Sequence, residues 1–205
     1  MTPTLKLHLF GMPQLYLDDT PVTEFVTRKA LALFIYLASN RRLQPRDKLA
    51  ALLWRDVAEK QAHNSLRRVL PNLRQLVGSH LRIERHAVAF DEQQPFWLDT
   101  ELFRITLATL PSQPAPRPGA APLLNPDPIE QALAFYKYEF LDSFYVDDAP
   151  AFEEWVFLQR EELRELALRG FTYLTDYYLA QNNLAAGLTT TQRLLAIEPW
   201  HERAH

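Results

Sequence analysis

The side chains with the clearest chemical potential lie in the stretch 58–77, AEKQAHNSLRRVLPNLRQLV. Apolar residues recur there at steps of three and four, which predicts a helix with one apolar stripe. Arginine and amide side chains lie opposite that stripe, and their donors can read base edges and bind phosphates in a DNA major groove. Taken alone, the pattern favours an ordinary solvated face, because surface helices are usually charged. The outward face and its shoulders carry Lys60, Gln61, Asn64, Arg67, Arg68, Pro71, Asn72 and Gln75.

The charge of the chain is distributed unevenly along its length. The 205 residues have a formal net charge of −3, yet residues 28–85 contain 13 Lys/Arg and only 4 Asp/Glu. The first 100 residues are net positive, and the remaining residues are net negative. A basic segment attached to an acidic one is typical of a polyanion-binding module joined to a second part.

Short extended segments and a helix are expected before the basic stretch. Residues 5–11, 14–17 and 20–25 are β-rich around turn residues and predict a small antiparallel sheet. A helix is then expected over 28–38, with Thr27 as its N-cap. Its first turn carries two cations, which we expect to be solvated.

Two further helices and a hairpin follow. A second helix is expected over 45–54 with Arg46 exposed near its start, and the helix over 58–77 comes next. Residues 81–90 predict a hairpin that carries Arg85 at its turn. In a helix-turn-helix the second helix enters the major groove and the preceding one crosses the backbone, while a neighbouring hairpin can bring an arginine to the minor groove. The agreement of helix order, polar face, hairpin and local charge favours DNA binding over a merely solvated face.

Three runs of this sequence resemble the OmpR-type winged helix of SARP-like activators, the antibiotic regulatory protein family. They are RKALALFIYL (28–37), PRDKLAALLWRD (45–56) and NSLRRVLPNLRQLVG (64–78). The resemblance implies that the segment 55–59 faces RNA polymerase. It also implies DNA contacts from the wing residue Arg85 and from five side chains of the recognition helix, which are Asn64, Arg67, Arg68, Asn72 and Arg74.

Pro71 departs from the pattern of that family, which usually has a small or polar residue at this position. A proline in mid-helix removes the hydrogen bond to the carbonyl oxygen of Arg67 and is expected to kink the helix. Because Pro71 is expected on the outward face, the bend either follows the groove or reduces base contact. Both outcomes stay open at this point.

The second half of the chain predicts helices after a linker. Residues 109–127 are rich in proline and alanine and indicate a linker or a long surface loop. Helices are expected over 128–141, over 152–181 as one or two helices, and over 182–197. The spacing of aromatic and aliphatic residues in the last two resembles a tetratricopeptide-type hairpin.

This helical part also resembles the bacterial transcriptional activation domain that follows the winged helix in the same family. The likeness rests on the pair Phe140 and Leu141, on Trp155 and Arg160, and on the closing run LLAIEPWHERAH. The predicted organisation is an OmpR-type winged helix over 1–108, the linker, and a TPR-like activation domain over 128–205. Since the repeat pattern would begin another helix at the end of the sequence, we expect a truncated piece of a longer protein.

Catalytic, cofactor and membrane chemistry is not indicated. The chain has no cysteine and only five glycines, so thiolate chemistry and a glycine-rich phosphate loop are not expected. Glu59 and His63 share a helix face, but without a third ligand they make a poor metal site. No apolar run approaches the roughly 20 residues of a membrane span, and no signal peptide is evident. We expect neither an enzyme nor a bound metal or cofactor, and a cytoplasmic location.

Together these observations predict a mainly α protein with small β-sheets that acts as a sequence-specific DNA-binding transcriptional regulator, specifically an activator. Arg68 and Asn64 are expected to read bases, and Arg46 and Arg85 to contact phosphates. The expected partners are double-stranded DNA with repeated half-sites, RNA polymerase, and a second copy through the helical domain. The alternative is a helical-repeat interaction scaffold whose winged helix does not bind DNA, which Pro71 and the modest charge of the first half support.

Overall fold

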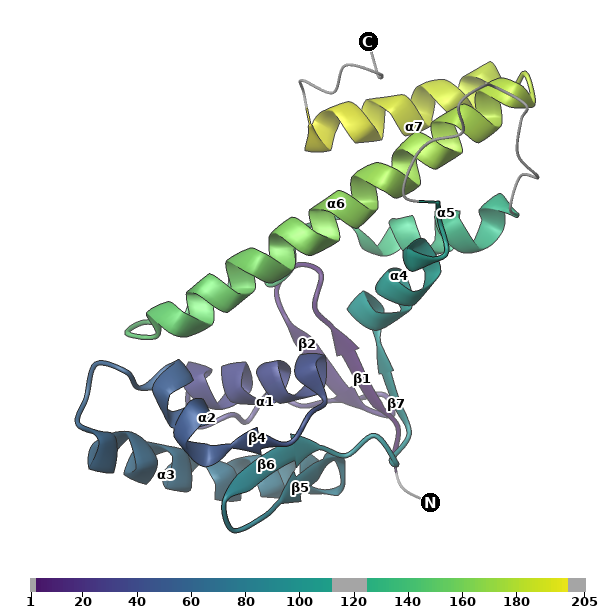
Figure 1. The fold of residues 1–205 in the computed structure, drawn as a ribbon. Helices are drawn as coiled ribbons and strands as arrows, with labels where there is room; N and C mark the ends of the chain where they lie inside the picture. The colour runs from purple at the N-terminus through teal and green to yellow at the C-terminus, as the bar shows by residue number, and fades with distance from the viewer. Residues whose placement is uncertain (1–2, 112–124, 199–205) are drawn as a thin grey trace. The chain divides into compact units, whose positions relative to one another are not determined.

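Helices and two small sheets make up this protein, as the computed structural model describes it for residues 3–111 and 125–198 (Figure 1). The fold class predicted from the sequence, mainly α with small β-sheets, is confirmed. Residues 112–124, which belong to the expected linker, lie outside the described residues.

Each of the two compact units of the chain combines two separate stretches of sequence. The first unit contains residues 1–98 and 141–158, and the second contains residues 99–140 and 159–205. Helix α6 (Pro150–Ala180) therefore contributes residues to both units. The functional division of the chain at the proline-rich linker stays a prediction.

The first unit begins with a four-stranded sheet of order β3-β2-β1-β7. The antiparallel pairing of β1 with β2 and of β2 with β3 confirms the small sheet predicted before the first helix. Only two residues of the expected third segment form a strand, and β7 pairs with β1 in parallel, which the sequence did not predict. The alternating leucines of β1 are fully buried. The strands are β1 (Leu5–His8), β2 (Gln14–Leu17), β3 (Thr20–Pro21) and β7 (Phe96–Leu98).

Helix α1 (Arg28–Asn40) follows the sheet, and its predicted N-cap is confirmed. The Thr27 hydroxyl accepts a hydrogen bond from the Ala30 backbone N–H, which satisfies one of the free donors of the first turn. At the other end, Arg41 adopts a left-handed conformation with φ of 49° and donates its N–H to the Leu37 carbonyl oxygen. Such an αL residue commonly ends a helix by binding an orphan carbonyl.

Two helices and a three-stranded antiparallel sheet of order β4-β6-β5 complete the winged helix. The predicted second and third helices and the hairpin are confirmed, whereas the short strand β4, which pairs with β6, was not predicted. Helix α1 packs against β6 and against both other helices. The long helix α3 continues through Pro71 to its end. These elements are β4 (Gln44–Pro45), α2 (Arg46–Leu53), α3 (Glu59–Val77), the 3-10 turn η1 (Gly78–His80), β5 (Leu81–Ile83) and β6 (Ala87–Phe90).

Residues 141–158 pack on the winged helix within the first unit. Arg28 and Lys29, the two cations expected to be solvated, donate to the carbonyl oxygens of Tyr145 and Asp148 at 3.4 and 3.0 Å. The first turn of α1 therefore binds backbone oxygens, which are partly negative and suit two cations.

The second unit consists of helices. The predicted helix over 128–141 was too long, because α5 (Pro126–Phe135) ends at Phe135 and an irregular segment follows. Helix α4 (Asp99–Ala108) packs against α5, and Phe103 stacks on Tyr136 at 5.7 Å between ring centroids. Gly170 of α6 lies against Leu107 and Leu133, where an added Cβ would lie 3.0–3.2 Å from their methyl groups. Helix α7 (Leu184–Ile197) then forms a hairpin with α6, with Asn183 as its N-cap.

Candidate nucleic-acid interface

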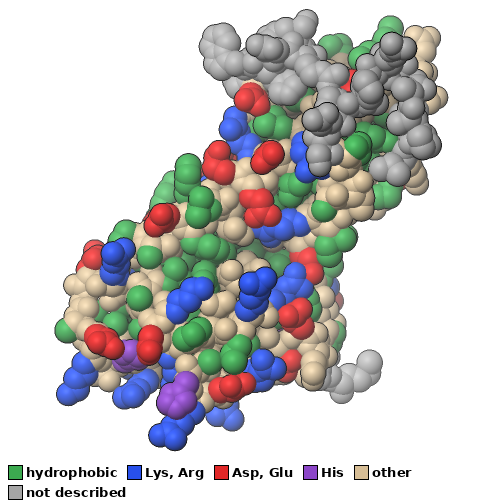
Figure 2. All heavy atoms as spheres, viewed as in Figure 1, with side chains coloured by type: hydrophobic (Ala, Val, Ile, Leu, Met, Phe, Trp, Pro, Cys, Tyr) green, Lys and Arg blue, Asp and Glu red, His purple; other side chains and the backbone are tan. Residues whose placement is uncertain are grey.

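Helix α3 divides into a buried face and an exposed face as its sequence period requires. The buried side chains are apolar and include Leu66, Val69 and Leu73, which attach the helix to the core. Asn64, Arg67, Arg68 and Arg74 are all exposed. In Figure 2, blue Lys and Arg side chains and purple His side chains gather along the lower edge of the first unit, where Figure 1 places α3 and the β5–β6 hairpin. Four of the seven predicted site residues therefore lie on one solvent-facing helix surface.

A polar cavity of about 360 Å³ brings together residues from three elements of the winged helix. Arg46 comes from the start of α2, Arg67 from α3 and Arg85 from the tip of the β5–β6 hairpin. We call this cavity the arginine cavity. Three guanidinium groups around one opening suit an anion with several oxygens, such as a phosphate. The remaining lining residues are Asp47, His63, Leu66 and His86.

The hairpin is attached to α2 by hydrogen bonds from a single residue. The Arg46 backbone N–H donates to the His86 carbonyl oxygen at 2.9 Å, and its guanidinium Nη2 donates to the Glu84 carbonyl oxygen at 2.9 Å. Arg46 Nε is buried, and the described residues offer it no hydrogen-bond partner. Pro45 gives α2 no side-chain cap, and the Arg46 N–H finds its partner in the hairpin instead. Arg46 Nε is therefore a buried donor without a partner among the described residues, and it lies beside the arginine cavity.

Histidine and aspartate add titratable groups to the same cavity. His63 Nε2 lies 3.3 Å from Asp47 Oδ1, and the Asp47 side chain is 86% exposed. Asp47 is the one acidic residue among the described residues that line the arginine cavity. The cavity thus remains strongly cationic even with this pair formed.

Asn72 differs from the other predicted site residues. Its side-chain Nδ2 donates to the Glu24 carbonyl oxygen at 3.0 Å, and its Oδ1 accepts from the Val26 backbone N–H at 3.1 Å. One donor and the acceptor of the amide are therefore used by the loop before α1, and reading an adenine needs both. In this structure Asn72 holds a loop to α3.

The remaining predicted residues are exposed but not brought into the cavity. Asn64, Arg68 and Arg74 do not line it. On the hairpin, Arg82 Nε lies 3.3 Å from Glu84 Oε1, and this ion pair offsets the positive charge of Arg82. Exposed arginine and amide groups on α3 suit base contacts, whereas the cavity suits a backbone phosphate.

His80 connects the end of α3 to both sheets. It is fully buried, with its Nδ1 3.1 Å from Ser79 Oγ and its Nε2 3.1 Å from the Pro95 carbonyl oxygen. Burial lowers the pKa of His80, although its hydrogen bond to Pro95 and the charge of Asp91 oppose the shift. A neutral imidazole therefore supports the base of the hairpin.

The sequence interpretation missed His63, His86 and Asp47 as members of this site. His63 precedes Arg67 by one helical turn, and His86 directly follows Arg85, so their positions beside predicted site residues were visible in the sequence. Their shared cavity was not visible, because it depends on contacts between separate elements.

Other kinds of site find little support in the described part of the chain. No group of three or more His, Cys, Asp or Glu residues in 3–111 and 125–198 is arranged to hold a metal ion. Within the same ranges no helix has both the length and the apolarity to cross a membrane.

A solved structure has the same architecture. The structure of Mycobacterium tuberculosis EmbR in complex with a low-affinity phosphopeptide matches 98% of this chain with a TM-score of 0.67 and 21% sequence identity. EmbR combines a winged helix with a helical domain and is a regulatory protein. The fold of this chain is therefore a winged helix joined to a helical domain.

This likeness confirms the fold that the sequence resemblance implied, winged helix and helical domain together. The present chain spans about half, 52%, of the length of the EmbR chain. Neither protein-family models nor curated proteins match this sequence.

Proposed function

We propose that this chain is a sequence-specific DNA-binding regulator of transcription, an activator, that inserts α3 into the major groove. The observation that carries the proposal is the arginine cavity beside the exposed face of α3. Arg46, Arg67 and Arg85 line this cavity from three elements. Phosphate contacts there would fix the register of the protein on the duplex, while the exposed side chains of α3 contact base edges in the groove.

The proposed division of labour follows from these positions. Arg68 and Asn64 project from α3 into solvent and are proposed to read bases, with Arg74 beside them on the later part of the helix. Arg67, Arg46 and Arg85 are proposed to hold phosphates and thereby fix the register of the protein on the duplex. Asn72 is proposed to support α3 through the loop that it binds, without contacting a base.

Further partners are part of the same proposal. Residues 55–59 are exposed between α2 and α3 and are proposed to face RNA polymerase. Leu184 and Leu188 of α7 are 64% and 62% exposed, which suits self-association through the helical part and binding to repeated half-sites. Because bacterial DNA lies in the cytoplasm and the sequence resembles a bacterial regulator family, we propose a cytoplasmic location.

The second candidate is a protein-interaction scaffold whose winged helix does not bind DNA. Two observations favour it: the amide of Asn72 is bound by the protein's own loop, and Pro71 interrupts the exposed face of α3. Four exposed polar side chains on that helix and the cationic cavity favour DNA binding instead.

A titration of the full chain against DNA separates the two candidates. Duplexes selected from a random pool and an unselected duplex of equal length are titrated at two salt concentrations. The regulator is expected to bind both, to bind the selected duplex about 10³-fold or more tightly, and to lose affinity as salt rises. Absence of salt-dependent binding to either duplex would favour the scaffold.

A further inference from the structure

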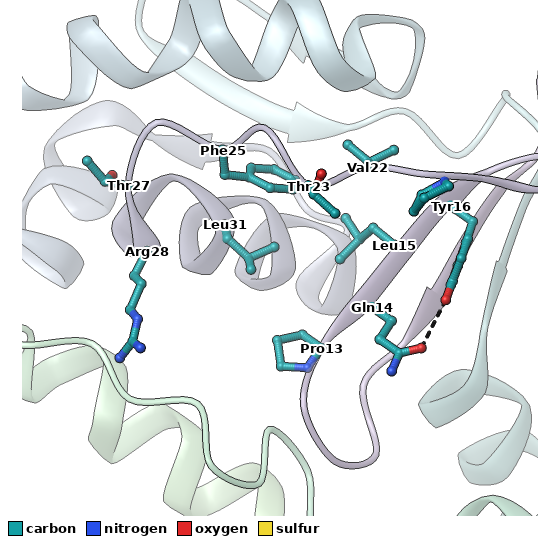
Figure 3. Close-up of a pocket in the computed structure, with 11 residues that line it drawn as sticks. Pro13, Gln14, Leu15, Tyr16, Val22, Thr23, Phe25, Thr27, Arg28 and Leu31 are labelled. Carbon is teal, nitrogen blue, oxygen red and sulfur yellow. Dashed lines mark hydrogen bonds between the residues drawn. The ribbon is translucent and has the colours of Figure 1, made fainter.

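An apolar groove lies in the first unit, away from the arginine cavity and unused by the proposed DNA contacts. It has a volume of about 330 Å³ and is lined by the start of β2, the segment 21–27 and the first turns of α1. Figure 3 shows Leu15, Phe25 and Leu31 side by side in its interior, with Arg28 at one end and Tyr16 at the other. This volume is at the lower end of the range for small-molecule sites, which is roughly 300–1,000 Å³.

The groove has one charged end. Arg28 is the one cation among the described residues that line it, and none of these lining residues is acidic. The guanidinium is exposed and makes a long hydrogen bond of 3.4 Å to the Tyr145 carbonyl oxygen. The first turn of α1 contains no acidic side chain, so no carboxylate within that turn offsets the positive end of the helix dipole. An apolar interior with a cation at one end is complementary to a molecule with an apolar body and a carboxylate.

The segment that forms one wall of the groove is also bound by the proposed recognition helix. Val22, Thr23 and Phe25 line the groove from this segment. The intervening backbone groups, the Glu24 carbonyl and the Val26 N–H, are held by the Asn72 side chain of α3. A molecule that packs on Phe25 therefore contacts a segment whose other side is bonded to α3.

We propose that this groove binds a small amphipathic carboxylic acid, whose carboxylate pairs with Arg28 and whose apolar body packs on Leu15, Phe25 and Leu31. The bound acid shifts the segment 22–27 and changes the position of α3 through Asn72. The groove is then an effector site. Its effect on DNA affinity rests on the proposed function, whereas the binding of the acid does not.

The binding test uses the full chain with isotopically labelled leucine methyl groups and side-chain amides. Phenylacetate and octanoate are the probes, and phenylacetamide is the neutral match for phenylacetate. Both acids are expected to give saturable shifts of the Leu15 and Leu31 methyl signals, and the amide is expected to bind about tenfold more weakly, as for the loss of one charge-assisted contact. No saturable shift at millimolar acid, or equal binding of acid and amide, would overturn the proposal.

Two substitutions and a matched control locate the site. Arg28→Gln is expected to weaken acid binding about tenfold, and Thr23→Trp fills the groove from an exposed position and should abolish binding. Arg42→Gln removes an exposed arginine that does not line the groove and should leave acid binding unchanged. If Arg28→Gln and Arg42→Gln bind the acid equally, Arg28 is not its partner and the assignment is wrong.

The coupling has a readout that needs no DNA. Saturating acid is expected to shift the side-chain amide signals of Asn72, and an unchanged Asn72 signal with shifted leucine methyls would refute the coupling alone. With DNA, saturating acid should change the affinity of wild type for the selected duplex several-fold, and Asn72→Ala should bind acid normally but lose this effect. If acid binds and shifts Asn72 while no duplex binds at any salt, the proposed function fails and the effector site stands.

Discussion

The guanidinium of Arg46 donates a hydrogen bond to the backbone carbonyl oxygen of Glu84, with 2.9 Å between Nη2 and the oxygen. This bond joins the first residue of α2 to the residue that follows β5. The Arg46 backbone N–H makes a second connection to the hairpin at His86. One arginine thereby fixes the position of the hairpin beside α3, and it also lines the cavity proposed to hold a phosphate.

Replacement of Arg46 by alanine is expected to lower the free energy of unfolding by about 1 kcal/mol, because the solvent-exposed hydrogen bond from its guanidinium to the Glu84 carbonyl oxygen is lost. Urea unfolding of the full chain measures the change. Arg85→Ala is the matched control, since Arg85 is exposed and should change stability by no more than about 0.5 kcal/mol. Equal stability losses in the two variants would show that the Glu84 bond does not hold the hairpin.

Arg85→Ala should instead affect DNA binding. As a phosphate contact, Arg85 is expected to contribute equally to selected and unselected duplexes, so its loss weakens both by the same factor. The slope of log affinity against log salt should fall by about 1. A loss confined to the selected duplex would mean that Arg85 reads a base.

Arg68→Ala and Asn64→Ala are expected to weaken binding to the selected duplex by about 1–3 kcal/mol each and to relax base preference at the positions that they contact. Both side chains are exposed on α3 and lie outside the arginine cavity. Competition between the selected duplex and its single-base variants measures the effect. If Arg68→Ala kept wild-type specific affinity, the proposed recognition face would be misplaced.

The asparagines of α3 should behave differently from one another. Asn72→Ala removes two solvent-exposed hydrogen bonds, to the Glu24 carbonyl oxygen and the Val26 N–H, and we expect a loss of about 1 kcal/mol in the free energy of unfolding. Its effect on DNA affinity should be the same for selected and unselected duplexes. Asn64→Ala, on the exposed face, should leave stability nearly unchanged and reduce specific binding only. If Asn72→Ala left stability unchanged and weakened binding to the selected duplex only, Asn72 would be a base-reading residue after all.

The elements that carry the proposed site were largely predictable from local sequence patterns. The apolar stripe of 58–77 predicts α3 to within a residue at its start, and Thr27 correctly marks the start of α1. The sequence indicates an extended segment within 95–103, where β7 lies, but it did not predict the parallel pairing of β7 with β1. Strand β4 was missed altogether, because it contains only two residues and pairs with a strand far away in sequence. Periodicity cannot reveal such short, non-local pairs.

The same limit applies to the site. Arg46, Arg67 and Arg85 could be proposed singly from charge and position, but their common cavity depends on how α2, α3 and the hairpin pack. The helical period places Asn72 on the shoulder of the outward face, and only the structure reveals that its amide binds a loop 46–48 residues earlier. The sequence was therefore enough to propose the DNA-binding residues. Separating those proposed to contact DNA from Asn72, which holds a loop to α3, required the distances in the structure.

The buried His80 makes a final prediction about pH. Its pKa lies below the ordinary value of 6.5 in the folded protein because burial disfavours the imidazolium. Unfolding therefore takes up a proton once the pH falls below about 6.5, so the contribution of His80 to stability is fully present above that pH and is lost as the pH falls.

Urea unfolding of wild type and His80→Gln between about pH 7.5 and pH 5 measures this contribution. Glutamine can keep a hydrogen bond to the Pro95 carbonyl oxygen but does not titrate. We expect the wild type to lose more stability than the variant as the pH falls, by at most about 1.4 kcal/mol per pH unit, which corresponds to one proton. Parallel pH profiles would mean that His80 is protonated equally in the folded and unfolded chains, and the buried neutral imidazole would then be excluded as the support of the hairpin.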